Sequence, residues 1–263
     1  MGTPGARRVE TAALRRGIEL GLTHIDTAEM YGNGAAEEVV AEAIAGLPRE
    51  RLFIVSKVLP QNASYDGTVA ACEGSLRRLR TDYLDLYLLH WRGRHPLAET
   101  MRALEVLVDA GKIRALGVSN FDVAELDEAR ALLRRHPLAC NQVLYHLRER
   151  YVERALLPYC VQHGIALCGY SPFGTERFPG PDVAAARVLE TIAGRHGASV
   201  TPRQVALAFL VRQPPLFAIP KAGRSEHVDE NAAALHLCLT EEDLHEIDLA
   251  FPATAATAEL PVV

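Results

Sequence analysis

The sequence predicts a β/α barrel of the TIM type, built as one domain over residues 1–263. Short β-branched and aliphatic runs alternate with longer amphipathic runs, and this unit recurs roughly every 30 residues, which is typical of parallel strands covered by helices. The apolar share of 49% suits a large core, and barrels of ~250 residues occur as single domains. The run Leu84–His90 is almost continuously apolar, as expected of a strand buried on both faces.

The predicted elements follow from this alternation. Seven short apolar runs are expected to be strands: Thr23–Ala28, Leu52–Val58, Leu84–His90, Ile113–Asn120, Leu138–Tyr145, Ile165–Ser171 and Leu216–Pro220. Amphipathic periodicity predicts the helices: Val9–Leu20, Ala35–Ala45, Gly67–Leu79, Ala98–Asp109, Val123–Arg134, Arg154–His163, Asp182–His196, Pro202–Arg212, Glu226–Leu235 and one that starts at Thr240. Two of these are additional to the repeating unit: the inserted helix Asp182–His196 and the helix that follows Thr240.

Capping signals support several of these bounds. Pro202 suits the first turn of a helix whose N-cap is Thr201. Gly111 and Gly164 follow predicted helices and suit left-handed C-caps. A capping-box-like start opens the last helix at Thr240.

The count of strands is one short of a closed eight-stranded barrel. The first predicted helix, Val9–Leu20, is preceded by eight residues that include Gly2, Pro4 and Gly5, and such residues are poor in buried strands. We therefore expect only seven barrel strands and an incompletely closed barrel. Unpaired strand edges cost stability, so we expect the chain to be less stable than an extended one, or to associate through these edges.

Composition excludes several classes of function. The net charge is −5 and no basic stripe is present, so a nucleic-acid partner is not expected. No apolar stretch reaches ~18 residues, so no membrane span is expected. Five scattered cysteines suit reduced thiols in the cytoplasm. No His/Asp/Glu spacing suggests a metal site.

Polar residues gather where the predicted strands end, and in a β/α barrel these ends meet at the mouth that carries the active site. They are Asp26, Tyr31, Lys57, His90, Ser119, Asn120, Gln142, Tyr170, Ser171 and Lys221. Each has a simpler structural interpretation when taken alone: Asp26 as a helix cap, Tyr31 as a half-buried aromatic, His90 as a core histidine. Their recurrence at one end of successive strands favours a functional site.

Four members of this set make chemical sense as a group that reduces a carbonyl: Asp26, Tyr31, Lys57 and His90. Hydride addition to a carbonyl creates an alkoxide that needs a proton, and a tyrosine with an ordinary pKa of ~10 is a poor acid unless its anion is stabilised. A lysine ammonium does this, and an aspartate keeps the lysine charged and oriented. A neutral histidine can donate a hydrogen bond to the carbonyl oxygen. We therefore expect Tyr31 to be the acid, tuned by Lys57 and Asp26, with His90 as the polarising group.

Several stretches together resemble the aldo-keto reductase superfamily, in particular its bacterial methylglyoxal-reductase-like branch. The resemblance runs from about Val9 to Leu249 and is carried by these segments: Ile25–Gly32, Val55–Lys57, Tyr83–Trp91, Gly117–Phe121, Asn141–Leu147, Tyr170–Pro172, Ala218–Lys221 and Asn231–Ala233. Relative to the family pattern, the chain is expected to lack the N-terminal hairpin and the first barrel strand.

The resemblance implies an NADPH-dependent reductase of small aldehydes and ketones, with the family's catalytic tetrad at Asp26, Tyr31, Lys57 and His90. It assigns residues to the parts of the cofactor as follows: Ser119, Asn120 and Gln142 to the carboxamide, Tyr170 to the nicotinamide ring, Ser171 and Phe173 to the loop around the pyrophosphate, Lys221 to the 2′-phosphate, and Glu230 and Asn231 to the adenine. There is no Gly-x-Gly-x-x-Gly motif after a strand, so a Rossmann site is not expected.

One departure bears on the cofactor. His227 stands where many relatives carry an arginine that grips the 2′-phosphate, and Arg224 is close enough in sequence to substitute. NADPH remains the expected cofactor, with NADH possible and weaker. Trp91 and Met30 are expected to line the substrate pocket, although Trp91 could simply pack in the core. A monomer or weak homodimer is expected.

Two alternatives remain open from the sequence. A degenerate member would bind the cofactor without turnover, because an incomplete barrel could misplace nicotinamide and substrate. An unrelated β/α-barrel enzyme, such as an aldolase or a metal-dependent hydrolase, is the other. A Schiff base on Lys57 is disfavoured there, because a neighbouring carboxylate would hold the amine protonated.

Overall fold

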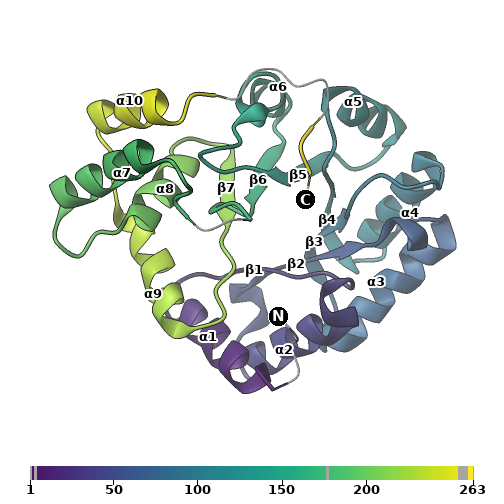
Figure 1. Ribbon diagram of the computed structural model, residues 1–263. Helices are drawn as coiled ribbons and strands as arrows, with labels where there is room; N and C mark the ends of the chain where they lie inside the picture. Colours follow the sequence, from purple (N-terminus) through teal and green to yellow (C-terminus); the bar gives the residue numbers. More distant parts are fainter. Residues whose placement is uncertain (1, 3–4, 176–177, 254–259, 263) are drawn as a thin grey trace. The chain divides into compact units, whose positions relative to one another are not determined.

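The structure, a computed structural model, describes residues 2, 5–175, 178–253 and 260–262. Figure 1 traces these residues along the chain. They form two compact units. Unit 1 comprises residues 1–141 and 223–225, and unit 2 comprises residues 142–222 and 226–263. The prediction of a single domain stays a prediction.

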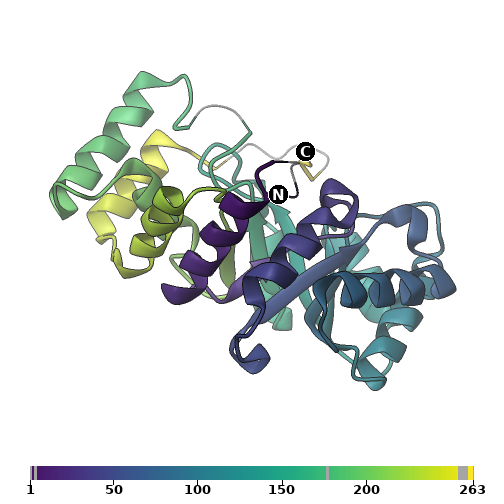
Figure 2. The ribbon, with the colours of Figure 1, turned by 90° about the horizontal axis from the view of Figure 1, so that it is seen from below.

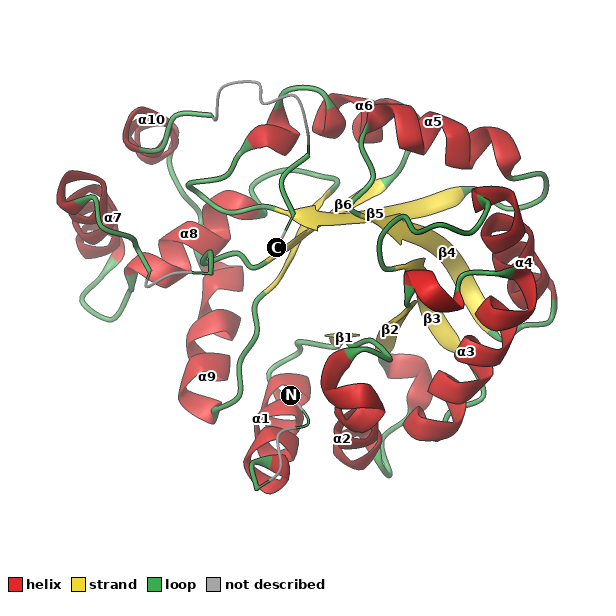
Figure 3. Cartoon of the chain, turned by 45° about the vertical axis from the view of Figure 1, so that its right-hand side comes forward, coloured by secondary structure: helices red, strands yellow, loops and turns green. Residues whose placement is uncertain are grey.

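Unit 1 alternates helices and strands in chain order. Its elements are α1 (Arg7–Glu19), β1 (His24–Asp26), η1 (Tyr31–Gly34), α2 (Ala35–Ile44), η2 (Arg49–Arg51), β2 (Phe53–Val58), η3 (Pro60–Asn62), α3 (Tyr65–Leu79), β3 (Leu84–Leu89), α4 (Leu97–Asp109), β4 (Ile113–Ser119) and α5 (Val123–Leu132). Strands β1 to β4 pair in parallel, each with the next. Helices α2, α3 and α4 follow one another along the outer side of these strands (Figure 3).

The core of unit 1 lies on both faces of its central strands. All six residues of β3 are buried, and five of the six residues of β2 are buried. The prediction that the run around β3 is a strand buried on both faces is confirmed. Helices α3 and α4 contact β2 and β4 respectively, so the apolar faces of these helices cover the sheet.

Strand β5 (Leu138–Leu144) begins in unit 1 and continues into unit 2. The remaining elements are η4 (Tyr151–Glu153), α6 (Leu156–His163), β6 (Ala166–Tyr170), α7 (Val183–His196), α8 (Pro202–Leu210), β7 (Leu216–Ile219), α9 (Ser225–Ala233), η5 (Ala234–His236) and α10 (Glu241–Ala250). Strand β6 pairs with β7 in parallel. The predicted cap of α8 is confirmed, because the N-cap Thr201 and Gln204 form a complete capping box and Pro202 is the first residue of the helix.

The inserted helix α7 packs beside α8 and α10 within unit 2 (Figure 2). Asp243, at the start of α10, accepts hydrogen bonds from Thr240 and contacts His196 at 2.8 Å and Arg195 at 3.0 Å. These contacts connect the last turn of α7 to the first turn of α10. The two helices beyond the repeating unit therefore support each other.

Among the described residues the prediction of seven strands is confirmed, and each element with two predicted bounds begins and ends within two residues of them. Helix α1 begins at Arg7, and residues 2, 5 and 6 ahead of it form no strand. Among the described residues, β1 has one strand neighbour, β2, and β7 has one, β6.

No helix in the described ranges has both the length and the apolar character needed to cross a bilayer. None of the five cysteines forms a disulfide.

Candidate active site

Lys57 is the centre of the predicted tetrad and comes from β2 of unit 1. Its side chain is fully buried, and its ammonium donates to Oδ1 of Asp26 at 2.5 Å, to the carbonyl of Thr27 at 2.9 Å and to Oη of Tyr31 at 3.4 Å. The parallel pairing of β1 with β2 places Asp26 beside Val55, which brings the carboxylate within reach of the lysine. Unit 1 thus brings Asp26, Tyr31 and Lys57 together, as predicted.

The loop between β1 and α2 presents Tyr31. The amide of Tyr31 donates to the carbonyl of Ala28 at 3.1 Å. The three residues after Tyr31 all have positive φ: 59° at Gly32, 53° at Asn33 and 89° at Gly34. Glycine and asparagine are the residues that adopt this conformation at least cost, so the segment Gly32–Gly34 allows the chain to turn sharply after Tyr31 into α2.

Glu29 holds this loop against the next one. Its Oε1 accepts from the amide of Leu59 at 2.7 Å and from Nδ2 of Asn62 at 3.0 Å. The loop that carries Tyr31 is therefore attached to the loop that follows β2 and Lys57. Glu29 lies within a stretch of family resemblance but was not among the predicted site residues.

His90 follows β3 directly and is 7% exposed. Its ring lies edge-on to Tyr31, with centroids 5.7 Å apart, and its centroid is 4.8 Å from that of Trp91. Nδ1 of His90 is buried and makes no hydrogen bond within the described residues. Trp91 is 37% exposed and Met30 42% exposed, so the interpretation of Trp91 as plain core packing is wrong.

Burial and neighbouring charges set the protonation states of Lys57 and His90. Burial tends to lower the pKa of Lys57, but the charge and hydrogen bonds of Asp26 and Tyr31 outweigh it and raise that pKa above its usual value. For His90, burial and then the Lys57 charge lower the pKa to about 4. At neutral pH unit 1 therefore holds a charged ammonium beside a neutral imidazole.

The end of β4 contributes two of the predicted carboxamide-binding residues. Ser119 ends the strand, and Asn120 follows with a φ of 61°. Nδ2 of Asn120 contacts Oγ of Ser119 and the backbone carbonyl of His90, both at 3.2 Å. Asn141 exchanges hydrogen bonds with the backbone of Phe121, accepting at 3.4 Å and donating at 2.8 Å, which braces this turn from β5. The strained conformation of Asn120 is thus supported on both sides.

Unit 2 carries most of the other predicted cofactor residues. Gln142 is buried in β5, with Nε2 4.0 Å from Sγ of Cys168. Tyr170 ends β6, and Ser171 follows with a φ of 50°. The carbonyl of Ser171 accepts from the amide of Gly174 at 2.8 Å, so the chain turns sharply just after the strand and around Phe173.

The predicted adenosine-binding residues lie on and before α9. Lys221 follows β7 and is exposed. Oε2 of Glu230 is 3.7 Å from Nδ1 of His227. Asn231 is 6% exposed, and its Oδ1 has no hydrogen-bond partner among the described residues. Arg224 is exposed and belongs to unit 1.

Sequence reasoning missed Arg203, in the first turn of α8. Its guanidinium carbon lies 3.6 Å from the ring centroid of Phe173, and its Nε lies 3.6 Å from Oε2 of Glu230. An arginine at the start of an amphipathic helix looks like an ordinary solvated charge, so no signal in the sequence marked it.

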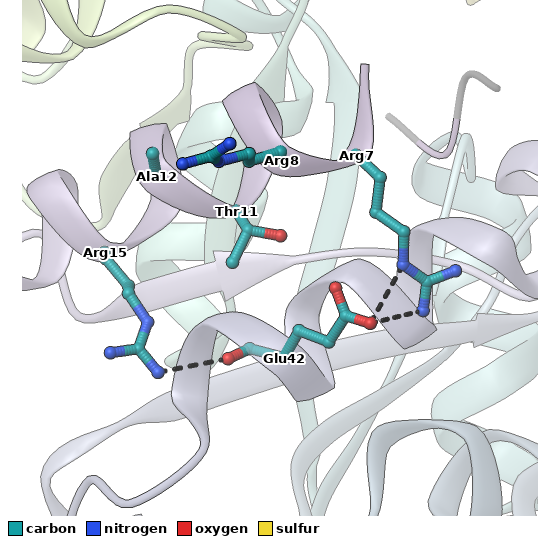
Figure 4. Close-up of a pocket in the computed structure, with 6 residues that line it drawn as sticks. All are labelled: Arg7, Arg8, Thr11, Ala12, Arg15 and Glu42. Atoms are coloured by element: carbon teal, nitrogen blue, oxygen red, sulfur yellow. Dashed lines mark hydrogen bonds and ion pairs between the residues drawn. The ribbon is translucent and has the colours of Figure 1, made fainter. Parts of the chain in front are cut away.

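A separate surface depression lies between α1 and α2 (Figure 4). Three of its charged groups, Arg7, Arg15 and Glu42, already have partners: Arg7 pairs with Glu38 and Glu42, and Arg15 donates to the carbonyls of Glu42 and Ala45. No member of the tetrad lines it, so it is part of the packing of α1 on α2. Elsewhere in the described ranges, no group of three His, Cys, Asp or Glu side chains could hold a metal ion.

Comparison with known proteins identifies the family of this chain. The model of the aldo/keto reductase family matches residues 4–250. Methylglyoxal reductase YeaE of Escherichia coli is 47% identical over 98% of this chain and 89% of its own length, and the glyoxal reductase of Bacillus subtilis is 40% identical over 90% of this chain and 82% of its own.

Solved structures show the same fold. An aldo-keto reductase from Klebsiella pneumoniae, in complex with NADPH, is 46% identical and matches with a TM-score of 0.92 over 100% of this chain and 92% of its own. A second structure from that organism, with NADP and acetate, gives a TM-score of 0.90 at 45% identity, over 99% of this chain and 91% of its own. The predicted barrel fold and carbonyl-reductase class are confirmed. The chain belongs to the aldo/keto reductase family.

Proposed function

We propose that the chain reduces small aldehydes and ketones, such as methylglyoxal, to alcohols with NADPH, and that Tyr31 donates the proton. The observation that carries this proposal is the set of three contacts made by Lys57 in unit 1. The names of the relatives, methylglyoxal reductase and glyoxal reductase, support the substrate class.

The lysine contacts fix the direction of the tyrosine proton. An ammonium has three N–H donors and no acceptor, and the three donors of Lys57 go to Asp26, Thr27 and Tyr31. Oη of Tyr31 therefore accepts from Lys57, and its own proton can go to a carbonyl oxygen. When that proton leaves, the ammonium stabilises the phenolate that remains. The same protonation leaves Lys57 without the lone pair that a Schiff base needs, which argues against an aldolase.

His90 supplies a hydrogen bond rather than a charge. Because its pKa is lowered to about 4, its ring is neutral at pH 7 and carries one N–H. Nδ1 is buried without a partner, and an N–H there would be unsatisfied. The tautomer with the proton on Nε2 is thus favoured, and Nε2–H is the group that would donate to the carbonyl oxygen.

The residues present fit a nicotinamide dinucleotide. Oδ1 of Asn231 is a buried acceptor without a partner, and an amino group such as that of adenine would satisfy it. In unit 1, Ser119 and Asn120 are the proposed partners of the carboxamide. In unit 2, Gln142, Tyr170, Ser171, Phe173, Lys221, His227 and Glu230 remain the proposed cofactor residues. When bound, NADPH supplies the hydride.

Small carbonyl compounds fit the surroundings of the tetrad. Trp91 and Met30 are both partly exposed, and both are apolar. We propose that they contact the carbon skeleton of the substrate while Tyr31 and His90 donate hydrogen bonds to its carbonyl oxygen. Five cysteines that form no disulfide agree with the proposed cytoplasmic location. We also propose a monomer or a weak homodimer.

The test is the rate of NADPH oxidation with methylglyoxal, glyoxal and an aromatic aldehyde, followed by the absorbance of the reduced nicotinamide. We expect carbonyl-dependent oxidation and formation of the matching alcohol. Tight NADPH binding without any carbonyl-dependent oxidation would instead support the degenerate, cofactor-binding alternative.

A further inference from the structure

Glu37, in the first turn of α2, is a charged side chain buried inside unit 1. Its exposed fraction is 0%, and a buried carboxylate is costly unless charges and hydrogen bonds compensate for it. Both oxygens have such partners: Oε1 accepts from Oγ of Ser56 at 2.6 Å, and Oε2 accepts from Nε of Arg78 at 2.5 Å. Because Ser56 lies on β2 and Arg78 on α3, the carboxylate joins three elements of this unit.

The bond to Ser56 connects Glu37 to the tetrad through the backbone of β2. Ser56 and Lys57 are consecutive residues of this strand, and both are fully buried. Successive side chains of a strand point to opposite faces. Ser56 therefore contacts α2 from one face, while the ammonium of Lys57 contacts Tyr31 from the other. A shift of β2 relative to α2 would move this ammonium.

Arg78 connects Glu37 to the turn that follows Tyr31. Gly34 ends that turn with a φ of 89°, and a β-carbon on it would lie 2.7 Å from Cδ of Arg78 and 2.8 Å from Nε. The arginine side chain thus packs directly on the backbone of Gly34, at a distance that only glycine allows. Through Arg78, the carboxylate holds both the start of α2 and the turn before it.

The contact that depends on these two connections is the one between Nζ of Lys57 and Oη of Tyr31. At 3.4 Å it is the longest of the three contacts of the ammonium, and hydrogen bonds are lost beyond such a distance. Tyr31 lies just before α2 and Lys57 lies on β2, so the contact depends on how these two elements are held together. Glu37 is the side chain that holds them.

We propose that Glu37 is a positioning residue: together with Ser56 and Arg78, it fixes the distance between Tyr31 and Lys57 and so supports proton donation by Tyr31. Glu37 itself donates no proton. Its action is separate from that of Glu29, which joins the loop before Tyr31 to the loop after β2. This inference rests on the proposed role of Tyr31 as the proton donor.

The first experiment compares the reduction of methylglyoxal by the wild type and by Glu37→Gln at saturating NADPH. Glutamine keeps the shape of the side chain and can still accept from Ser56, but it removes the charge that faces Arg78. We expect kcat to fall about 10-fold while the Kd of NADPH stays within about twofold, because a misplaced acid affects the transition state rather than cofactor binding. Glu38→Gln is the matched control, since this neighbouring side chain is 47% exposed, and it should leave kcat unchanged.

The second experiment introduces Glu37→Gln into the Tyr31→Phe variant, assayed at high enzyme concentration. If Glu37 acts by positioning the tyrosine hydroxyl, its loss has no hydroxyl left to misplace. We therefore expect kcat to change by less than about twofold in this background. A purely structural role, such as a smaller folded fraction, would lower kcat by the same factor in both backgrounds.

Ser56→Ala is a milder variant that removes only the hydrogen bond to β2. We expect it to lower kcat about threefold, since the salt bridge from Glu37 to Arg78 remains. It carries the test should Glu37→Gln fail to fold, and its effect should also disappear in the Tyr31→Phe background.

Hydrogen–deuterium exchange gives a readout that needs no turnover. The amides of Tyr31 and Asn33 donate to the carbonyls of Ala28 and Met30 at 3.1 Å and 3.2 Å, and such bonds open when a loop moves. We expect these two amides to exchange about fivefold faster or more in Glu37→Gln, with the amides of α4 unchanged.

Three outcomes would overturn the inference: a wild-type kcat in Glu37→Gln, an equal loss of kcat in the two backgrounds, or unchanged exchange at Tyr31 and Asn33. A wild type that does not oxidise NADPH with any carbonyl compound would contradict the proposed function instead. Faster exchange at Tyr31 in Glu37→Gln would then still support the positioning of this loop by Glu37.

Discussion

Lys57 shows how single atoms determine the chemistry of unit 1. A buried ammonium is costly unless its donors find partners, and all three N–H groups of Lys57 do so. Two of the partners, Asp26 and the carbonyl of Thr27, keep the charge in place. The third partner is Tyr31, whose phenolate this charge would stabilise. In the proposed reaction the lysine is therefore a positioned electrostatic group, and the hydroxyl of Tyr31 is the source of the proton.

The role of the tyrosine can be tested by removing its hydroxyl. We expect Tyr31→Phe to lower kcat by about 10²- to 10⁴-fold, the range for a positioned acid, with NADPH affinity nearly unchanged because the ring remains. Steady-state kinetics and fluorescence titration measure the two effects. Retention of more than about a third of the wild-type kcat would reject Tyr31 as the proton donor.

The lowered pKa of His90 predicts a pH-dependent stability. The group has a pKa of about 4 in the folded chain and ~6.5 when unfolded. Between these values the unfolded state binds the extra proton, so the free energy of unfolding falls as pH drops from ~6.5 towards 4, by up to about 3 kcal/mol.

Urea unfolding at pH 7 and pH 4.5 measures this effect, and His90→Gln should lose less stability on acidification than the wild type. His146 also has a pKa lowered to about 4, by burial and by Arg148, so the comparison of wild type with variant isolates His90. Identical losses in the two proteins would contradict the assignment.

At the scale of elements, the site depends on loops held to one another. The β1–α2 loop carries Tyr31, and Glu29 joins it to the β2–α3 loop through Leu59 and Asn62. A shift of ~1 Å in a reacting group can cost up to ~10²-fold in rate. We therefore expect the hydrogen bonds of Glu29 to contribute to catalysis by positioning Tyr31, with no chemistry performed by the Glu29 side chain itself.

We expect Glu29→Ala to lower kcat by about 10-fold, because Tyr31 is less well positioned, while NADPH affinity stays within about twofold. Glu38→Ala, on the exposed side of α2, is the matched control and should leave kcat unchanged. Kinetics at saturating NADPH compare the two variants. If Glu29→Ala keeps the full wild-type kcat, the loop contact does not position Tyr31.

For the whole molecule, cofactor binding should contribute to stability. A ligand that binds only the folded state stabilises it by about 2.7 kcal/mol at a concentration 100 times its Kd. For a chain of this size, in which 1 kcal/mol shifts Tm by about 2–4 °C, that corresponds to a rise in Tm of about 5–11 °C. We expect NADPH to raise Tm in this range in a thermal melt and NADH, at the same concentration, to raise it less. A Tm that does not respond to NADPH would contradict the proposed cofactor.

The sequence by itself determined the order and bounds of the elements and the place of the tetrad. Periodicity distinguishes buried strands from amphipathic helices, and the ends of parallel strands share one edge, so Asp26 and Lys57 could be predicted to meet. Glu29 and Asn141 lie in stretches that resemble the family, but their bracing role depends on backbone atoms that become neighbours only in the fold.

Only the tertiary structure decided the protonation state of His90 and the contact between Arg203 and Glu230. The neutral state of His90 follows from burial, and burial is a property of the packed chain. Arg203 and Glu230 are far apart in sequence, and the packing of the start of α8 near α9 brings them together. A charged residue at a helix start carries no local pattern that distinguishes a ligand from a solvated side chain. Local sequence thus specifies elements, whereas the environment of a charge depends on contacts between residues distant along the chain.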